Sequence, residues 1–307
     1  MFLKKVLFIS FFLLLFSNVN AIENKILIKV DNKIITSIDI FKETQYLIAI
    51  NKDIKKLSKN KIFEIAKNSL IKKTIKQNEI LKFVKDINLD EKFTDELIKS
   101  NSLKLGFSSL NDFQKHLMNF DIKIETLRER LTTEVLWNEL IVKKYSNQLT
   151  IDKERIKKEI LSNGKKIKSY LLSEIVFNLL TGSNIEEKFK KIENEISKNG
   201  FDNAALIYSI SDSSSSGGKL GWIKETSLNK VIKEKIVNLK KGQHTQPIII
   251  SSGFLLLKVE DIKIIDQQLD LQKEVEKRII SEKNQQLNQF SLMYYNKIKK
   301  NVNIDEL

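Results

Sequence analysis

The residues that could carry out chemistry are few and stand far apart in the sequence. The chain has two histidines, His116 and His244, and no cysteine, so the usual ligand set of a zinc ion is missing. It has neither a phosphate-binding G-x-x-x-x-G-K loop nor a G-x-S-x-G turn around a nucleophile. The serine run Ser213–Ser216 predicts a turn, and His116, beside an apolar helical stripe, predicts a surface or hydrogen-bonded core histidine. We therefore expect no metal, no cofactor and no use of ATP.

The most distinctive stretch is Ser211–Trp222, SDSSSSGGKLGW, which holds three of the nine glycines. Glycine serves where the backbone needs a positive φ or a close approach, so the stretch predicts a turn closed by Trp222. The neighbouring patterns predict strand, helix, glycine-rich loop, helix, turn and strand. The expected elements are a strand at 170–177, helices at 185–198 and 228–239, a short helix or turn at 201–210, and strands at 248–250 and 254–259.

This order of elements, with the pieces GG-x-LGW, KG-x-x-x-x-P and GF-x-x-LKV, resembles the parvulin family of peptidyl-prolyl isomerases over roughly 168–265. The resemblance implies a small α/β domain with an antiparallel-type sheet. It also implies rotation of X-Pro bonds, which must cross a barrier of about 18–20 kcal/mol.

The catalytic positions of the family have changed in this chain. The resemblance places the two histidines of the family at Glu174 and Leu255, and its cysteine or aspartate at Ser211, with Asp212 next to it. A carboxylate and an isobutyl group cannot replace the exchangeable hydrogen bonding of imidazoles. We expect weak or no isomerase activity. The alternative is an active enzyme, because twisting an apolar-bound amide needs little acid–base help.

The proline slot of the family is lined by an aromatic residue and a methionine, which align with Ile232 and His244. The slot therefore stays apolar at Ile232 and becomes polar at His244. Both residues are expected to contact substrate.

The N-terminal part predicts a hairpin at 26–36 and then a series of helices with apolar residues at helical spacing. The expected helices are 38–51, 59–84, 90–104, 109–119, 123–147 and 156–164, the last ended by Gly164, with lysines 165, 166 and 168 as a solvated linker. VDNKIITSIDIF, and later FSSLNDFQKHL and DIKIETLRERL, resemble the N-terminal domain of the SurA family of periplasmic chaperones over about 24–160.

The C-terminal part predicts one long helix at 266–300 and a short last strand within 301–307. A single helix with an apolar stripe must dock, and the SurA resemblance implies docking on the N-terminal helices. Docking on the parvulin-like unit is the alternative. Between this helix and the helices of 38–147 we expect an apolar cradle for clients. Its candidate lining or floor residues are Phe113, Leu117, Phe120, Trp137, Phe290 and Tyr294.

The first 21 residues, with Lys4-Lys5, an apolar run and Val19-Asn20-Ala21, predict a cleavable export signal. A membrane anchor is the alternative, but the run is shorter than the roughly 20 residues of a spanning helix. The formal net charge is +14, yet lysines are dispersed among glutamates. That dispersal argues against a nucleic-acid surface.

Together these features predict an α+β protein: a mostly helical N-terminal domain completed by the C-terminal helix, plus the parvulin-like domain. The expected division is 1–21, 22–165, 166–265 and 266–307. The expected function is a periplasmic, ATP-independent chaperone without stable membrane insertion. Its partners would be unfolded outer-membrane β-barrel precursors, other exported polypeptides and the outer-membrane assembly machinery. The alternatives are an exported isomerase and a secreted structural or adhesive protein.

Overall fold

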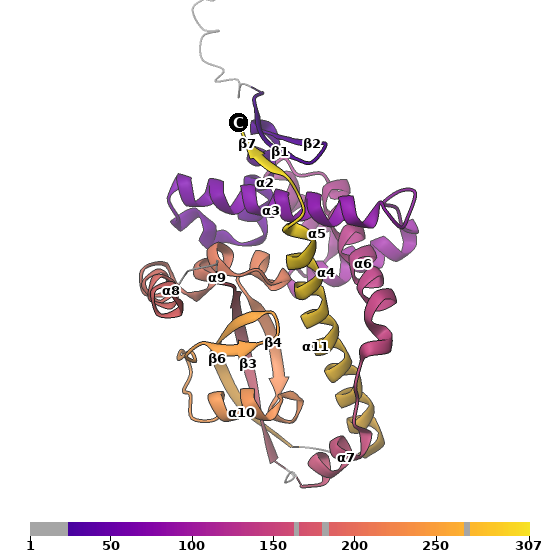
Figure 1. The fold of residues 1–307 in the computed structure, drawn as a ribbon, viewed down its shortest axis with the longest axis vertical. Helices are drawn as coiled ribbons and strands as arrows, with labels where there is room; N and C mark the ends of the chain where they lie inside the picture. The colour runs from indigo at the N-terminus through magenta and orange to yellow at the C-terminus, as the bar shows by residue number, and fades with distance from the viewer. Residues whose placement is uncertain (1–23, 163–165, 180–183, 267–270) are drawn as a thin grey trace, which may run out of the picture.

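The computed structural model describes residues 24–162, 166–179, 184–266 and 271–307 (Figure 1). The predicted signal segment, Gly164 and the expected first turn of the last helix lie outside these residues, apart from Asp266, which ends a strand. No helix within the described ranges is both long and apolar enough to cross a membrane.

The N-terminal part begins with the hairpin of β1 (Ile26–Val30) and β2 (Lys33–Thr36). The helices that follow are α2 (Ser37–Ile50), η2 (Lys52–Lys56), α3 (Lys59–Ile80), α4 (Glu91–Lys104), α5 (Leu110–Met118), α6 (Ile124–Tyr145), η3 (Ser146–Gln148) and α7 (Lys153–Ser162). The α-helices match the expected ranges to within a few residues, because each has local start signals and a periodic apolar face.

Helix α2 shows such a local signal. The Thr36 hydroxyl accepts a hydrogen bond from the Asp39 backbone N–H at 3.2 Å, and the Asp39 carboxylate accepts one from the Thr36 N–H at 2.8 Å. This reciprocal capping box satisfies two N–H groups that a helix start otherwise leaves unpaired. The helix therefore begins directly after the hairpin.

Within the described residues the strands form two antiparallel sheets. The first has the order β2-β1-β7, so β7 (Ile304–Glu306) pairs with β1, with Ile304 opposite Val30. The second has the order β4-β3-β6-β5 and contains β3 (Lys166–Phe177), β4 (Lys219–Lys224), β5 (Ile248–Ile250) and β6 (Gly253–Asp266).

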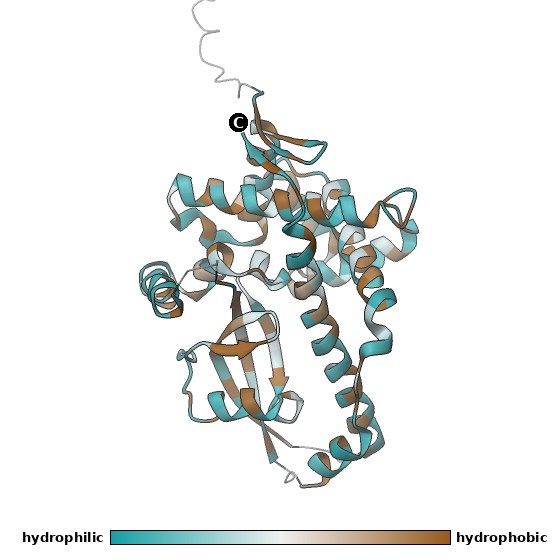
Figure 2. Ribbon diagram, viewed as in Figure 1, coloured by the Kyte–Doolittle hydropathy of each residue, from teal (hydrophilic) through white to brown (hydrophobic). Residues whose placement is uncertain are grey.

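Helices cover both faces of the second sheet. The elements between its strands are α8 (Ile185–Asn199), α9 (Phe201–Tyr208), η4 (Asp212–Ser216), η5 (Glu225–Ser227) and α10 (Lys230–Ile236). Ile192 of α8 and Phe201 of α9 pack with Ile175 on one face. Ile236 of α10 packs with Leu172 on the other. Figure 2 shows apolar residues concentrated in the strands, with polar and apolar bands alternating along the helices.

Two sequence expectations for this sheet are wrong. The segment expected to be a glycine-rich loop contains strand β4, which pairs with β3 through Trp222 opposite Leu171. The lysines expected to form a linker include Lys166, where β3 already begins. In both places cross-strand hydrogen bonds, which no local pattern reveals, decide the structure.

Helix α11 (Leu271–Lys299) runs beside both parts of the molecule (Figure 1). It contacts α3, α6 and α7, and also η5 next to the second sheet. Trp137 of α6 and Tyr294 of α11 stack with ring centroids 5.8 Å apart, and the Trp137 Nε1–H donates to the Ser291 Oγ at 2.8 Å. The helical part completed by α11, with the smaller antiparallel sheet unit, confirms the expected α+β fold.

Candidate functional site

The main candidate site is a cavity of about 680 Å³ between the second sheet and α11. Its volume lies within the range of about 300–1,000 Å³ that is common for ligand pockets. One wall is apolar and comes from the sheet and α10. This wall includes Leu172, Val176, Leu228, Ile232, Leu255 and Leu257. Residues of α11 supply another part of the lining, and Figure 1 shows this helix running beside the sheet unit.

A polar cluster lies at the edge of the apolar wall. The Ser211 and Ser213 hydroxyls both donate to the Glu174 Oε1, at 2.5 and 2.8 Å. Burial raises the pKa of Glu174 above its ordinary value of 4.5, and these two hydrogen bonds oppose the rise. The serine run is therefore a short 3-10 helix whose hydroxyls satisfy a partly buried carboxyl group.

The glycine pair fixes the backbone at this cluster. Gly218 has a φ of +77°, and its carbonyl accepts a hydrogen bond from the Glu174 N–H at 2.8 Å. A Cβ at Gly218 would stand 2.2 Å from the Glu174 carbonyl oxygen. Only glycine permits this approach, so the glycine expected from the sequence to make a turn also holds the site together.

Only some of the predicted site residues line the same cavity. Glu174, Ser211, Asp212, Leu255 and the slot residue Ile232 line the cavity.

His244 does not reach the cavity. It pairs with Lys258 across the strands, and its ring lies 6.4 Å from that of Phe201. Because Phe201 packs on the other face of the sheet, His244 is not a wall of the apolar slot in this structure.

The predicted client-cradle residues build the protein interior. Phe113 and Trp137 are fully buried, and Leu117 is nearly so. The six residues also divide between two clusters: Phe113, Leu117 and Phe120 in one, and Trp137, Phe290 and Tyr294 in the other. Trp137, Phe290 and Tyr294 thus pack together between α6 and α11, in the position of a cradle floor, whereas Phe113, Leu117 and Phe120 pack among the N-terminal helices.

His116 is a hydrogen-bonded histidine of this interior. Its Nε2 lies 2.8 Å from the Ala49 carbonyl oxygen, between the rings of Phe107 and Phe120. Among the described residues, no group of three or more acidic or histidine side chains could hold a metal ion.

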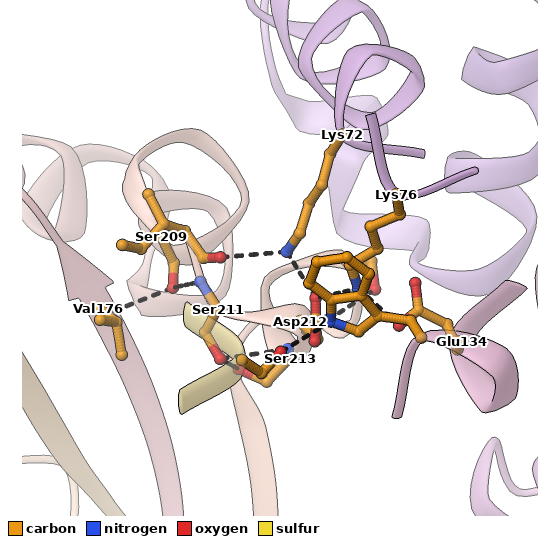
Figure 3. A network of polar contacts seen from close by, with 12 residues as sticks. Lys72, Lys76, Glu134, Val176, Ser209, Ser211, Asp212 and Ser213 are labelled. Atoms are coloured by element: carbon orange, nitrogen blue, oxygen red, sulfur yellow. Dashed lines mark hydrogen bonds and ion pairs between the residues drawn. The ribbon is translucent and has the colours of Figure 1, made fainter. Parts of the chain in front are cut away.

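Sequence reasoning missed the lysines that join the two parts of the molecule beside the cavity (Figure 3). The Asp212 Oδ1 accepts from the Lys72 Nζ at 2.7 Å and from the Lys76 Nζ at 2.9 Å, and Lys76 also pairs with Glu134 at 2.7 Å. The two ammonium groups hold the pKa of Asp212 well below its usual range despite its desolvation. No local pattern marks Lys76 as buried, because its partner Asp212 lies far away in the sequence.

A second set of contacts holds the first half of α11 beside η5. The Lys224 Nζ pairs with the Glu274 carboxylate at 2.9 Å, and the Gln285 Nε2–H donates to the Ser227 carbonyl at 3.0 Å. The Arg278 guanidinium donates to the Leu228 carbonyl at 3.2 Å. The cavity is therefore bounded at one end by the Asp212 pairs and at the other by these contacts.

Comparison with known proteins agrees with this geometry. Residues 178–261 match the Rotamase family, the PPIC-type PPIASE domain. The curated chaperone SurA of Sodalis glossinidius is 25% identical over 219 residues, which are 66% of this chain and 50% of that protein. The chaperone SurA of Pectobacterium atrosepticum is 23% identical over 211 residues, or 64% of this chain and 48% of its own length. This is a SurA-like protein with a PpiC-type domain.

The SurA-like chain spans about half the length of these curated relatives. Among solved structures it is similar to one of two SurA-like chaperones of Campylobacter jejuni. That similarity has 17% identity and a TM-score of 0.36, and covers 92% of this chain and 99% of the other.

Proposed function

We propose that this SurA-like protein is an ATP-independent chaperone that holds unfolded exported polypeptides, with outer-membrane β-barrel precursors as its main clients. The observation that supports this best is the cavity beside α11, with its broad apolar wall and polar opposite wall. We also propose export by a signal at 1–21, a periplasmic location, and the domain division 22–165, 166–265 and 266–307. Delivery to the outer-membrane assembly machinery belongs to the same proposal.

The client class follows from the chemistry of the cavity. Transmembrane β-strands alternate apolar and polar residues and carry unpaired backbone groups until they are assembled. Such a segment can place apolar side chains against Leu172 and Leu257 while its polar side chains stay in water. A reversible holding function needs contacts of this modest kind.

The PpiC-type domain is proposed to be catalytically degenerate. The Glu174 carboxyl group is engaged by two serine hydroxyls, and Leu255 offers only an apolar surface. Neither side chain supplies the imidazole hydrogen bonding that the parvulin resemblance implies for these positions. The domain would then contribute a wall of the binding cavity rather than a catalyst.

A weak isomerase is the second candidate, and the raised pKa of Glu174 favours it. Burial shifts the pKa of this carboxyl group toward the protonated form, and a protonated carboxyl group can donate a hydrogen bond to an amide. Glu174→Ala should then abolish prolyl-peptide isomerisation. A chain without isomerase activity would exclude this second candidate.

The decisive experiment measures two activities of the same preparation. One assay follows isomerisation of a proline peptide, with an active parvulin as the positive control. The other follows light scattering by a diluted, urea-unfolded porin. The chaperone proposal expects suppressed scattering without isomerisation. Unchanged scattering at a molar excess of the protein would refute it.

A matched pair of variants tests whether the cavity does the holding. Ile232→Lys places a charge in the apolar wall, whereas Val231→Lys changes a neighbouring residue that is 54% exposed and is not part of the cavity lining. Only Ile232→Lys should weaken the suppression of aggregation, with circular dichroism unchanged in both. Equal suppression by the two variants would place the client elsewhere.

A further inference from the structure

The part of the cavity lining formed by α11 is mainly polar, with Ile280 and Leu292 as its apolar members, whereas the sheet unit supplies most of the apolar lining. Lys277, Ser281, Asn284 and Asn288 recur every three or four residues and line the cavity, so they share one side of the helix. In the structure these residues line the same cavity as Leu172 and Leu257.

The hydroxyl and amide groups in the middle of this wall are available to a ligand. Among the described residues, Ser281, Asn284 and Asn288 make no side-chain hydrogen bond to the protein, whereas their neighbour Gln285 donates to Ser227. Asparagine carries both donors and an acceptor, and serine does the same with its hydroxyl. The wall therefore suits a neutral ligand that alternates N–H and C=O groups.

The cations at the start of the wall are engaged in ion pairs within the protein. At the first turns of α11, Lys277 and Lys224 share the Glu274 carboxylate, and Arg278 pairs with Glu282. The side chains further along, at Ser281, Asn284 and Asn288, carry no charge. What remains is a neutral hydrogen-bonding strip opposite an apolar one.

The spacing of the strip matches an extended peptide. Residues four apart on a helix rise by about 6.0 Å, and residues two apart on a strand by about 6.6 Å. Asn284 and Asn288 can therefore meet successive main-chain groups that point to the same side of an extended chain. From 277 to 292 the wall is about 22 Å long, which fits about seven extended residues.

We propose that this face of α11 reads the peptide backbone: an extended segment of unfolded polypeptide lies along it and hydrogen-bonds through alternate main-chain amides to Ser281, Asn284 and Asn288. The apolar side chains of the segment enter the opposite wall at Leu172 and Leu257. The inference rests on the proposed chaperone function and deepens it. Main-chain recognition explains how one site can hold many sequences.

The experiment uses two fluorescein-labelled ten-residue peptides of alternating valine and serine. One has ordinary amides, and in the other alternate amides on one edge are N-methylated, which removes their donors. Binding to the full-length protein is measured by fluorescence anisotropy for the wild type, Asn284→Ala/Asn288→Ala, and the control Asn296→Ala. Asn296 lies on α11 and is not part of the cavity lining.

For the wild type and Asn296→Ala, methylation should weaken binding by roughly two- to tenfold for each lost hydrogen bond. For the double variant, methylation should have little effect. The comparison cancels the intrinsic stiffening of the methylated peptide, because both proteins meet the same pair of peptides.

Equal losses on methylation in all three proteins would overturn the proposal, since the amides would then be read elsewhere or not at all. Failure of both peptides to bind a protein that suppresses porin aggregation would also overturn it, and would leave the chaperone function standing. A protein that neither binds peptides nor suppresses aggregation refutes both.

Discussion

The buried ammonium group of Lys76 offers a sharp test of how the two parts of the molecule are joined. Its side chain is only 1% exposed, and it pairs with Asp212 of the sheet unit and Glu134 of α6. Asp212→Asn removes the charge that crosses between the parts while keeping the shape. Lys76→Met removes the buried cation and leaves an apolar side chain of similar length.

The expected loss in the free energy of unfolding on Asp212→Asn lies between two limits. Removing one partner of a fully buried pair costs about 3–5 kcal/mol, and an exposed pair contributes about 0–1 kcal/mol. Here Asp212 is 44% exposed and Lys76 keeps Glu134. We therefore expect Asp212→Asn to lower the free energy of unfolding by about 1–3 kcal/mol. In Lys76→Met the change at Asp212 should matter less, and what remains reports the pair of Asp212 with Lys72 at 2.7 Å.

Urea denaturation of the two single variants and the double variant measures this coupling energy. Trp137 fluorescence is a suitable probe, because the Lys76 Nζ lies 5.4 Å from its ring. The control cycle uses Lys230→Met and Glu234→Gln, an exposed pair 4.0 Å apart, whose coupling should stay below about 0.5 kcal/mol.

The dependence of stability on acidic pH gives a second test of the ion pair between Asp212 and Lys76. The pKa of Asp212 is lowered from its ordinary value of 3.8, so its contribution is fully present above that pH and is lost as the pH falls further. Asp212→Asn should lack this loss. A coupling energy no larger than that of the control cycle would refute the reasoning that the pair is held in a desolvated interface.

Three further predictions concern the site and the core. Glu174→Gln should gain stability relative to the wild type as pH rises above 4.5, because burial raises the pKa of this carboxyl group and its contribution is lost with rising pH; the difference between the urea midpoints of the two proteins from about pH 4 to 7 measures it, and a difference that does not change with pH would contradict it. Gly218→Ala should lower the free energy of unfolding by about 1–3 kcal/mol more than Gly221→Ala. Both glycines have a positive φ near 80°, but only Gly218 faces backbone within 4 Å, so equal urea midpoints would exclude the clash. Trp137→Phe should cost about 1–3 kcal/mol through lost packing and the lost bond to Ser291, yet leave porin holding unchanged; a loss of holding in a folded variant would return this tryptophan to the client surface.

The helices could be predicted well because their signals are local. Thr36 and Asp39 mark the start of α2 with a capping box, and the apolar residues of α6 recur at helical spacing. Strand β4 could not be predicted in this way. It contains Gly221 with a φ of +81°, and it becomes a strand only because β3 supplies its hydrogen-bond partners.

The candidate site could be predicted only in part, for a related reason. Alignment to a family pattern found Glu174, Ser211 and Leu255, which line one cavity. Nothing local distinguishes Lys76 from the many solvated lysines, because its partner Asp212 lies 136 residues away. The aromatic stripes were likewise visible, but whether Trp137 meets a client or another helix depends on where α11 packs.

The pairing of β7 with β1 sets an order on how the chain can mature. Strand β1 is the middle strand of its sheet, and Val30 in it pairs with Ile304, about 270 residues downstream. This strand therefore has both of its neighbours only after the end of the chain has been made. Until then β1 presents an open edge that other chains could occupy. Closing a loop of this length is slow compared with forming local helices. A nascent copy is therefore itself a vulnerable polypeptide, and folding aids that act on newly made chains should matter to it as well.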